Sequence, residues 1–305
     1  MDLSIVVVSY NVRELLRGCL RSIRASLELS PELSSEVWVV DNASGDGSAA
    51  MVAQEFPETH LIRRDGNAGF AAASNEAIGQ STGRYVLLLN PDTLVLDDAL
   101  GAVVRFLDEH PKVGGAGARL LNPDGSRQHS CFRFPTLWMS FLDFFPLNHR
   151  LVNSRLNGRY PTRDDDRAYP VDHPLGAFFA VRREVIDQVG LLDEGFFMYC
   201  EEIDWALRIS RAGWPIYYVP TAKVIHYVGQ SARQFRSRML LELHRSRFRL
   251  FQKHYGPLYV WAHRRIVHLG LWSEARRARR AAARGDLTQA ELAERLEAYR
   301  QVCRL

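Results

Sequence analysis

Polar side chains follow the first two apolar, strand-like runs of the chain, at the point where each run ends. Ser9, Tyr10 and Asn11 come directly after the first run, and Asp41 and Asn42 come directly after the second. Hydroxyl, amide and carboxylate groups can hydrogen-bond a base and a ribose, and a tyrosine ring offers a stacking face. Capping of the following helices would explain either segment alone, but it explains the two together less well. We therefore predict a nucleotide site here.

The buried run at residues 85–89 is followed by a carboxylate and an amide. Asn90 and Asp92 flank Pro91, and their oxygens suit a hard divalent cation. Such an ion could bridge the oxygens of a diphosphate and offset the charge of a departing nucleotide. His226 also follows a strand-like run, and a neutral imidazole can complete a metal's ligand shell. The alternatives are a Pro-Asp turn and a histidine with a structural role.

Three carboxylates lie within four positions at the start of an expected helix over residues 201–211. They are Glu201, Glu202 and Asp204. Acidic residues in a first turn stabilise the positive end of a helix, which is one explanation for them. The functional interpretation is that one carboxylate accepts a proton from an incoming hydroxyl. Glu201 and Glu202 point in different directions on a helix, so only one of them is expected to face a cleft.

Strands and helices alternate over the first 120 residues and must position these side chains. The strand-like runs at 3–8, 37–40, 60–63 and 85–89 are separated by helical patterns. Strands that are almost continuously apolar indicate an α/β fold with a mostly parallel, Rossmann-like sheet flanked by helices on both faces. Ligands of such sheets bind beyond the carboxyl ends of the strands. A dinucleotide fingerprint G-x-G-x-x-G is missing after the first strand, which argues against an oxidoreductase of this fold.

The pattern becomes irregular after about residue 120 and helical after about residue 233. We expect strands at 176–181, 215–219 and 223–227, then helices over 234–255 and from 258 to the end. Scattered cysteines indicate neither a zinc site nor a disulfide framework. The sequence shows no signal-peptide pattern and no apolar run approaching the ~18 residues of a membrane span. We therefore expect a cytoplasmic protein.

The C-terminal part is strongly basic. Residues 233–284 contain 14 Arg and Lys but only two Glu, which gives this region a net charge of +12. Because the whole chain has a net charge of +4, the remaining residues together carry −8. This asymmetry predicts an anionic partner, and the region lacks a nucleic-acid-binding motif. Apolar side chains at helical spacing favour an interfacial helix on an anionic membrane; they are Leu258, Tyr259, Trp261, Ile266, Val267, Leu269, Leu271 and Trp272. The alternatives are a helical cap packed on the rest of the chain and a dimer contact.

Taken together and in this order, the motifs resemble glycosyltransferase family 2 on the GT-A fold, and particularly its bacterial rhamnosyltransferase-like branch. The resemblance spans residues 3 to about 255 and leaves 256–305 outside it. The matching segments are Val7-Val8-Ser9-Tyr10-Asn11, Val39-Val40-Asp41-Asn42-Ala43-Ser44, Asn67-Ala68-Gly69-Phe70 with Asn75, Leu88-Leu89-Asn90-Pro91-Asp92-Thr93, Gly176-Ala177 with Arg182-Arg183, Glu201-Glu202-Ile203-Asp204-Trp205, and His226-Tyr227-Val228-Gly229-Gln230-Ser231.

The resemblance implies a role for each of these residues. The donor nucleotide would be bound by Ser9, Tyr10, Asn11, Asp41, Asn42, Asn67, Gly69, Asn75 and Asn90. Asp92 matches the last carboxylate of the family's DxD metal motif, whose first position is here Asn90, and His226 matches a histidine that approaches the metal. The catalytic base falls at Glu202, where the family commonly has Asp, and Glu201 and Asp204 stay alternatives. Gly176 and Ala177 would contact the acceptor.

The implied activity is inverting transfer of a sugar from a nucleoside-diphosphate donor to a hydroxyl of a glycan or lipid-linked acceptor, with Mg²⁺ or Mn²⁺. The branch suggests rhamnose from dTDP-rhamnose and a role in polysaccharide or cell-wall synthesis. We expect a catalytic domain over 1–232, divided into nucleotide-sugar-binding (1–120) and acceptor-binding (121–232) halves, and a basic helical extension over 233–305. Alternatives are a sugar nucleotidyltransferase and a non-catalytic sugar-nucleotide-binding protein. Expected partners include an anionic membrane but no nucleic acid, and a homo-oligomer is an alternative.

Overall fold

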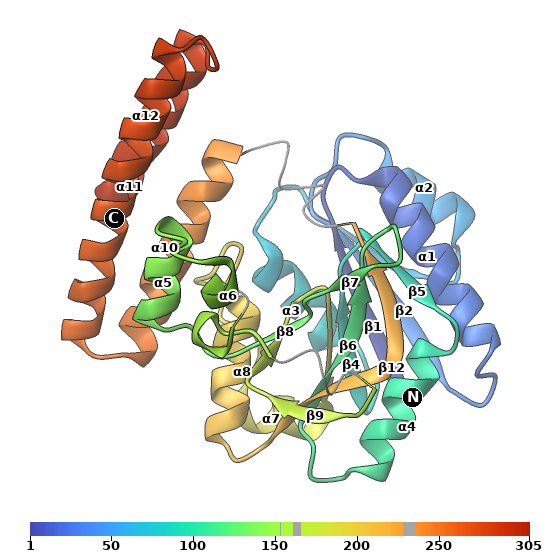
Figure 1. Ribbon diagram of the computed structural model, residues 1–305. Coiled ribbons are helices and arrows are strands. Elements are labelled where there is room, and N and C mark those ends of the chain that lie inside the picture. Colours follow the sequence, from blue (N-terminus) through green and yellow to red (C-terminus); the bar gives the residue numbers. More distant parts are fainter. Residues whose placement is uncertain (153, 161–165, 228–235) are drawn as a thin grey trace. The chain divides into compact units, whose positions relative to one another are not determined.

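The structure is a computed structural model that describes residues 1–152, 154–160, 166–227 and 236–305. The chain forms two compact units. Unit 1 comprises Met1–Phe132, Thr162–Phe197 and Glu201–Ser231, and unit 2 comprises Arg133–Pro161, Met198–Cys200 and Ala232–Leu305. Unit 1 carries the sheet, and unit 2 is helical (Figure 1).

One half of the sheet in unit 1 is parallel, as the sequence predicts. Its strands are β1 (Leu3–Ser9), β2 (Ser35–Asp41), β3 (His60–Arg63) and β4 (Tyr85–Leu89). They are ordered β3-β2-β1-β4, and every neighbouring pair in this half is parallel. The α/β fold class with a mostly parallel, helix-flanked sheet is therefore confirmed.

The other half of the sheet contains the strand expected at 176–181, and its antiparallel direction is a feature that the sequence pattern did not indicate. It continues with β11 (Phe178–Arg182), β6 (Gly115–Leu121), β12 (Ile216–His226) and β5 (Thr93–Leu96). The strand β11 runs antiparallel to both β4 and β6, whereas β12 is parallel to β6 and antiparallel to β5. The two short strands expected at 215–219 and 223–227 are one strand, β12, with an irregularity between Val219 and Lys223.

These strand directions bring several loops to one edge of the sheet. The carboxyl ends of β1, β2 and β4 lie at the same edge because the three strands are parallel. At this edge Phe178, the first residue of β11, pairs with Leu89, the last residue of β4. The strand β12 also ends there, and His226 pairs with Thr93 at the start of β5. The loops that follow β1, β2, β3, β4 and β12 therefore leave from this edge.

Helices cover the sheet of unit 1 on two faces. The helices are α1 (Arg13–Glu28), α2 (Ser48–Glu55), α3 (Phe70–Gln80), α4 (Ala99–Glu109), α7 (Arg183–Val189) and α8 (Glu201–Arg211). Neighbouring residues of a strand point to opposite faces. Phe178 accordingly joins the apolar core under α1, α2 and α4, whereas Phe179 meets Trp205 of α8, with ring centroids 5.7 Å apart.

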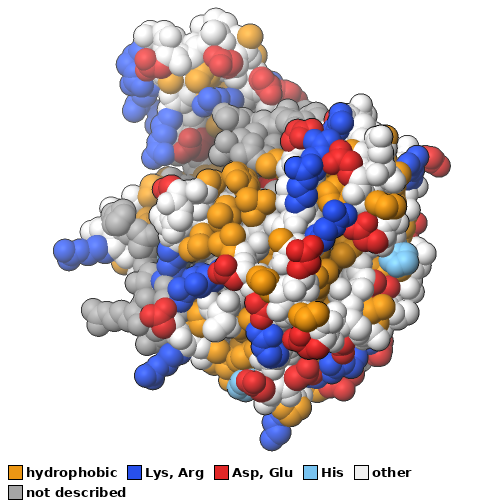
Figure 2. All heavy atoms as spheres, turned by 90° about the vertical axis from the view of Figure 1, so that its right-hand side faces the viewer, with side chains coloured by type: hydrophobic (Ala, Val, Ile, Leu, Met, Phe, Trp, Pro, Cys, Tyr) orange, Lys and Arg blue, Asp and Glu red, His pale blue; other side chains and the backbone are white. Residues whose placement is uncertain are grey.

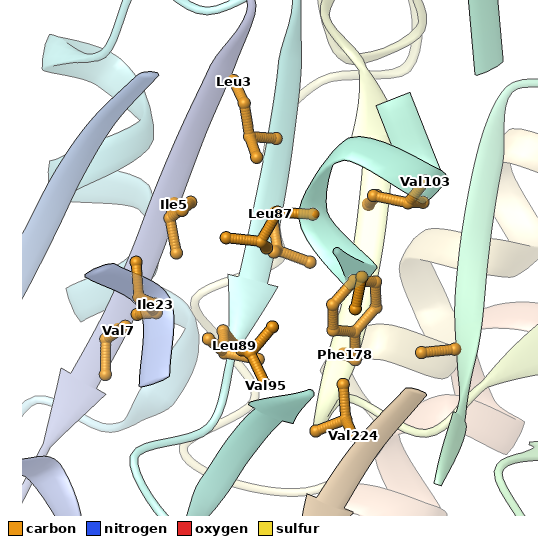
Figure 3. Close-up of a cluster of buried hydrophobic side chains, with 14 of the residues drawn as sticks. Leu3, Ile5, Val7, Ile23, Leu87, Leu89, Val95, Val103, Phe178 and Val224 are labelled. Carbon is orange, nitrogen blue, oxygen red and sulfur yellow. The ribbon is translucent and has the colours of Figure 1, made fainter. Parts of the chain in front are cut away.

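The main core of unit 1 is built from alternate residues of the central strands (Figure 3). Leu3, Ile5 and Val7 of β1 are fully buried, and Figure 3 shows them on the same side of the sheet as Leu87 of β4 and Ile23 of α1. Full burial of a branched aliphatic side chain contributes ~1.5–3 kcal/mol, so this cluster fixes the strands whose ends carry the polar loops.

The surface over α1 and α2 carries many charged side chains, with hydrophobic ones between them. Figure 2 shows basic and acidic side chains interspersed on the side of the molecule where these helices lie. Arg17 of α1 donates to both carboxylate oxygens of Glu55 on α2, and Arg24 pairs with Glu58 at 2.6 Å. The pair of Arg24 and Glu58 is exposed, and exposed ion pairs contribute little to stability.

Unit 2 consists of helices with a small core of their own. The helices are α5 (Leu137–Phe144), α6 (His149–Val152), α10 (Arg236–His254), α11 (Pro257–Ala283) and α12 (Gln289–Cys303). The core contains Phe248, Val267, Leu271 and Val302, with Phe144 packed against it. The helix expected from residue 258 to the end is interrupted: α11 ends before Gly285, whose φ is +82°, and α12 begins with a capping box between Thr288 and Glu291.

Among the described residues, no helix is both long enough and apolar enough to cross a bilayer.

Candidate active site

The ends of β1 and β2 carry two buried polar atoms whose hydrogen bonds are not satisfied within the described structure. Ser9 and Asp41 are register partners on the two strands. The Ser9 Oγ and the Asp41 Oδ1 are buried and have no hydrogen-bond partner among the described residues. The other oxygen of Asp41 accepts from the Ser44 amide at 3.1 Å. Since buried polar groups are nearly always hydrogen-bonded, these two atoms indicate a place for a polar ligand.

Asn11 joins the loop after β1 to the loop after β2. The side-chain Oδ1 of Asn11 accepts from the Gly45 backbone amide at 2.8 Å, and the backbone amide of Asn11 donates to Ser44 Oγ at 3.0 Å. Asn11 and Ala43 both have positive φ, +54° and +67°, a conformation that costs free energy in residues other than glycine and is frequent at functional sites. Tyr10 beside Asn11 is partly exposed.

Helix capping does not account for Asn11 and Asp41, because Asp46 satisfies the helix amides in their place. Neither Val12 nor Gly47, the N-cap residues of α1 and α2, makes a side-chain cap hydrogen bond. Asp46 instead accepts from the amides of Arg13 and Ser48, at 2.8 and 3.0 Å, and so satisfies one amide of each helix. Asn11 and Asp41 are therefore not needed as caps.

A second network joins Asn42 to the loop before α3. The Asn42 Nδ2 donates to Asn67 Oδ1 at 2.9 Å and to the carbonyl of Gly69 at 3.2 Å. Gly69 has φ of +88°, and a Cβ at this position would lie 2.3 Å from the Phe197 carbonyl oxygen. Only glycine fits both the backbone conformation and the space. These contacts fix the loop that is predicted to close over the donor.

Asn75 is bonded to protein atoms through both ends of its amide. It donates to the carbonyl of Leu192 at 2.9 Å and to Glu194 at 3.0 Å, and it accepts from the Leu192 amide at 3.0 Å. This buried side chain holds the segment around residue 192. These contacts give Asn75 a structural role. Its predicted role in donor binding would be a second role, in addition to this one.

The predicted metal ligands lie side by side although 134 positions separate them. The His226 Nε2 is 3.5 Å from Asp92 Oδ1, and both side chains are buried. This separation is longer than a normal hydrogen bond. The antiparallel pairing of β12 with β5 produces the contact, and the Tyr227 amide donates to the carbonyl of Asp92 at 2.9 Å.

Gln128 fixes the orientation of the His226 ring, and no sequence motif pointed to this residue. The His226 Nδ1 lies 2.7 Å from Gln128 Oε1, and the Gln128 Nε2 donates to the backbone carbonyl of His226 at 3.2 Å. Because an amide oxygen can only accept, Nδ1 carries the hydrogen, and the lone pair of a neutral ring is then on Nε2, facing Asp92. Metal-bound histidines are held in this way by a second residue.

The pair of Asp92 and His226 fits a divalent cation whose remaining ligands come from a substrate. Among the described residues, no group of three or more His, Cys, Asp or Glu side chains could hold a metal ion. Mg²⁺ is commonly held by one or two protein ligands together with substrate phosphates and water. An arrangement of two protein ligands at the end of β4 therefore suits a diphosphate-bound ion rather than a permanently bound one.

Gly176 and Ala177 connect the metal turn to the acidic segment of α8. The Asn90 amide donates to the Ala177 carbonyl at 3.1 Å. A Cβ on Gly176 would lie 3.6 Å from Cγ of Glu202, so the Glu202 side chain lies directly against this residue. The turn at Asn90–Asp92, the predicted acceptor residues and the predicted base therefore lie next to one another in space.

The three carboxylates of α8 have different surroundings. Glu202 is partly exposed, whereas Glu201 and Asp204 are buried. Burial and the neighbouring charge of Glu202 raise the pKa of Glu201 well above its usual range. Asp204 forms an ion pair with Arg208 at 2.9 Å. The partial exposure of its side chain and the contact with Gly176 favour Glu202 among the three as a proton acceptor, with Oε2 buried and Oε1 as the oxygen that would meet the incoming hydroxyl.

The backbone immediately before α8 is unusual. Tyr199 and Cys200 have φ of +71° and +67°, so two consecutive residues that are not glycine adopt the left-handed conformation. Such conformations cost ~1–3 kcal/mol each and cluster at functional sites. The motif segment 228–231 after His226 lies outside the described residues.

The fold and the convergence of these loops define a nucleotide-sugar transferase of the GT-A type, and the family comparison agrees. The chain belongs to the family described as Glycosyl transferase family 2, which it matches over residues 4–190. The resemblance seen in the sequence is confirmed, and the chain is a glycosyltransferase rather than a nucleotidyltransferase.

Two relatives carry rhamnosyltransferase names. N-acetylglucosaminyl-diphospho-decaprenol L-rhamnosyltransferase of Mycobacterium tuberculosis (strain ATCC 25618 / H37Rv) is 30% identical over 303 residues, covering 91% of this chain and 95% of the relative. Rhamnosyltransferase WbbL of Escherichia coli (strain K12) is 32% identical over 156 residues, covering 50% of this chain and 56% of that protein.

Solved structures support the fold. Mannosyltransferase PcManGT from Pyrobaculum calidifontis, in complex with GDP-Man and Mn²⁺, has a TM-score of 0.58 at 21% identity and covers 99% of this chain and 83% of its own. GalNAc-T7 with UDP, GalNAc and Mn²⁺ has a TM-score of 0.55 at 17% identity, over 74% of this chain and 44% of its own. At these identities the likeness shows the fold alone.

Proposed function

We propose that the chain transfers L-rhamnose from dTDP-rhamnose to a hydroxyl of a lipid-linked glycan, with inversion at the anomeric carbon. The observation that carries the proposal is the 30% identity to the mycobacterial rhamnosyltransferase, which extends over almost the whole of both chains. The name of that relative places its acceptor on a lipid diphosphate. A lipid-linked acceptor would place the reaction of this chain at a membrane surface and connect it to polysaccharide or cell-wall synthesis.

The donor would lie across the ends of β1, β2 and β4. Asp41 and Ser9 offer the unsatisfied oxygens for the nucleoside, with Tyr10 and Asn11 on the same loop. The network of Asn42, Asn67 and Gly69 would hold the closing loop. We keep residues 1–232 as the proposed catalytic domain, with nucleotide-sugar-binding and acceptor-binding halves at 1–120 and 121–232, and 233–305 as the extension.

The reaction would be a single in-line displacement. The acceptor hydroxyl oxygen attacks C1 of the sugar while Glu202 takes up its proton, and the bond from C1 to the diphosphate oxygen breaks. Asp92 and His226 would hold a Mg²⁺ or Mn²⁺ ion, which supplies positive charge against the diphosphate when bound. Gln128 keeps His226 oriented, and Gly176 leaves room beside Glu202 for the acceptor.

The test is transfer by the purified full chain. The assay supplies a prenyl-diphosphate-linked N-acetylglucosamine acceptor with dTDP-rhamnose, or in parallel with UDP-glucose, UDP-galactose or GDP-mannose. Product is identified by mass and by the anomeric configuration of the new linkage. We expect a rhamnosylated product with dTDP-rhamnose alone. Transfer from another nucleotide sugar would keep the glycosyltransferase activity and overturn the proposed donor, and retention of configuration would overturn the displacement.

A further inference from the structure

The helix α11 has two apolar faces, and only one of them is used within unit 2. The inward face carries buried residues at helical spacing, namely His263, Val267, Gly270, Leu271 and Ala278. Gly270 lies so close to α5 that a Cβ there would be 2.2 Å from Cγ of Phe144. Val267 and Leu271, which the sequence interpretation assigned to an interface with a membrane, therefore belong to the core of unit 2.

The opposite face of α11 is an exposed stripe of large apolar and basic side chains. Leu258, Trp261, Leu269 and Trp272 are 77%, 55%, 60% and 57% exposed. With Arg265 and Arg276 they follow one another at intervals of three or four residues, which places all six on one side of a helix. The stripe from 258 to 276 is about 27 Å long at 1.5 Å per residue. We call it the α11 stripe.

The basic residues of the α11 stripe are arranged around its tryptophans. The guanidinium carbon of Arg265 lies 5.4 Å from the centroid of the Trp261 ring, and that of Arg276 lies 4.3 Å from the centroid of the Trp272 ring. No ion pair is found for Arg265, Arg276, Arg279 or Arg280 among the described residues. The sole acidic residue of α11, Glu274, pairs with Arg277 at 2.7 Å. The positive charge of the stripe is therefore not neutralised within the described part of unit 2.

We propose that the α11 stripe binds the surface of a bilayer that contains anionic lipid. Tryptophan and leucine can enter the boundary between headgroups and acyl chains, and arginine at their side can stay with the phosphates. Each basic side chain close to an anionic surface strengthens binding roughly fivefold. The inference concerns unit 2 only and does not depend on which sugar the enzyme transfers.

A bilayer explains the stripe better than a second copy of the chain does. Two copies that met through this face would bring Arg265, Arg276, Arg279 and Arg280 of each copy together without a carboxylate on the stripe to offset them. Repulsion between like charges would oppose that contact. An anionic surface instead supplies the opposite charge along the whole length of the stripe.

The experiment is flotation of the full chain with vesicles of phosphatidylcholine, either alone or containing about one third phosphatidylglycerol. We expect recovery with the anionic vesicles, at least tenfold less with the neutral ones, and loss of binding as salt is raised. The variant Trp261→Ser/Trp272→Ser should lower recovery at least tenfold, and Arg276→Glu/Arg279→Glu should abolish the preference for anionic lipid. The control Arg21→Glu/Lys112→Glu, with the same change in charge on unit 1, should bind as wild type.

Folding and self-association are measured on the same samples. The substituted side chains of the stripe are exposed, so we expect the melting temperature and the hydrolysis of the donor in free solution to stay unchanged. Wild-type recovery of the Trp261→Ser/Trp272→Ser variant, or absence of binding to both vesicles by the full chain, would overturn the proposal. A dimer in light scattering that this variant converts to a monomer, without vesicle binding, would show that the stripe joins two copies instead.

Discussion

Glu201 and Glu202 are adjacent in sequence but differ in burial, and this difference sets their expected roles. Glu202 is partly exposed against Gly176, so a hydroxyl can reach it. We predict that Glu202→Gln lowers transfer at least ~100-fold, the usual scale for a general base, because an amide cannot take the proton. Donor binding should persist, which stabilisation of the protein by the nucleotide sugar in thermal unfolding will check.

Glu201→Gln is the matched control, and we expect a milder effect on transfer. The raised pKa of Glu201 means that the folded protein binds more protons than the unfolded chain above pH 4.5, so its stability falls as pH rises through that range. The side-chain amide of the variant does not ionise, so the variant does not lose this stability. The free energy of unfolding should thus increase at pH 7 but not at pH 4. If Glu201→Gln instead abolishes transfer while Glu202→Gln does not, Glu201 is the base.

Asp92 is the carboxylate that would complement the charge of a divalent ion. We predict that Asp92→Asn removes most activity and flattens its dependence on Mg²⁺ or Mn²⁺, because the amide carries no charge for the ion. The fold should be retained, since Tyr227 bonds to the backbone carbonyl of Asp92. Transfer rates titrated with each metal measure this, and wild-type activity that survives exhaustive chelation would rule out the metal.

Gln128 is expected to act through His226 rather than on the substrate. We predict that Gln128→Leu raises the Mn²⁺ concentration needed for half-maximal transfer by about 10- to 100-fold, as for other residues that orient a ligand. Saturating Mn²⁺ should restore much of the rate, whereas a merely structural defect would not respond to metal. The conservative variant Gln128→Glu keeps an acceptor for Nδ1 and should lie close to wild type. Equal metal requirements in all three proteins would contradict this role.

At the scale of elements, most strands with large apolar residues could be predicted, whereas β5, with Leu94, Val95 and Leu96, and β6 were missed. The runs at 3–8, 37–40 and 85–89 appear in the structure as β1, β2 and β4. The strand β6 gave no comparable signal because its first four residues are glycine and alanine. Small residues are needed there: a Cβ on Gly117 would lie 2.4 Å from Cβ of Pro174. Packing between distant segments selected these residues.

The same limit applies to the candidate site. Loops that leave parallel strands could be brought to one edge by reasoning from the sequence, because the carboxyl ends of parallel strands coincide. The direction of β11 and the hydrogen bond between Gln128 and His226, 98 residues apart, depend on pairings that no local pattern encodes. The interruption between α11 and α12 did have a local signal, Gly285 followed by the Thr288 capping box, which the helical periodicity obscured.

Gly69 tests whether the loop before α3 needs its strained geometry. We predict that Gly69→Ala lowers both stability and donor binding, because Cβ would meet the Phe197 carbonyl and φ of +88° disfavours any side chain. The cost should exceed the ~1 kcal/mol typical of a substitution at positive φ. Unfolding and donor titration measure it, with Gly66→Ala as control, since a Cβ at Gly66 meets nothing within 4 Å. Equal effects of the two substitutions would contradict the steric argument.

At the scale of the whole molecule, unit 2 buries titratable side chains that lie outside the candidate site. The core under the sheet of unit 1 is apolar. Unit 2 buries two histidines, His244 and His263, beside the aromatic rings of Phe144, Phe248 and Phe251. Neither ring nitrogen of His263 has a hydrogen-bond partner among the described residues. Burial lowers the pKa of His244 to about 4 and that of His263 to about 3, so both are neutral in the folded protein at pH 7.

These histidines make the stability of unit 2 depend on pH. Below pH 6.5 the unfolded chain protonates both rings while the folded chain does not, so the free energy of unfolding falls as pH drops from 6.5 toward 4 and 3. Glu201 acts in the opposite direction over part of this range, so a variant must isolate the effect. We predict that His263→Phe, which keeps a ring among the aromatic neighbours, reduces the loss between pH 6.5 and 4. Denaturant unfolding at a series of pH values will measure it, and His268→Gln, on the same helix but partly exposed, should leave the slope unchanged. If the free energy of unfolding depends on pH in the same way in wild type and His263→Phe, protonation of this ring does not limit the stability of unit 2, which carries the α11 stripe.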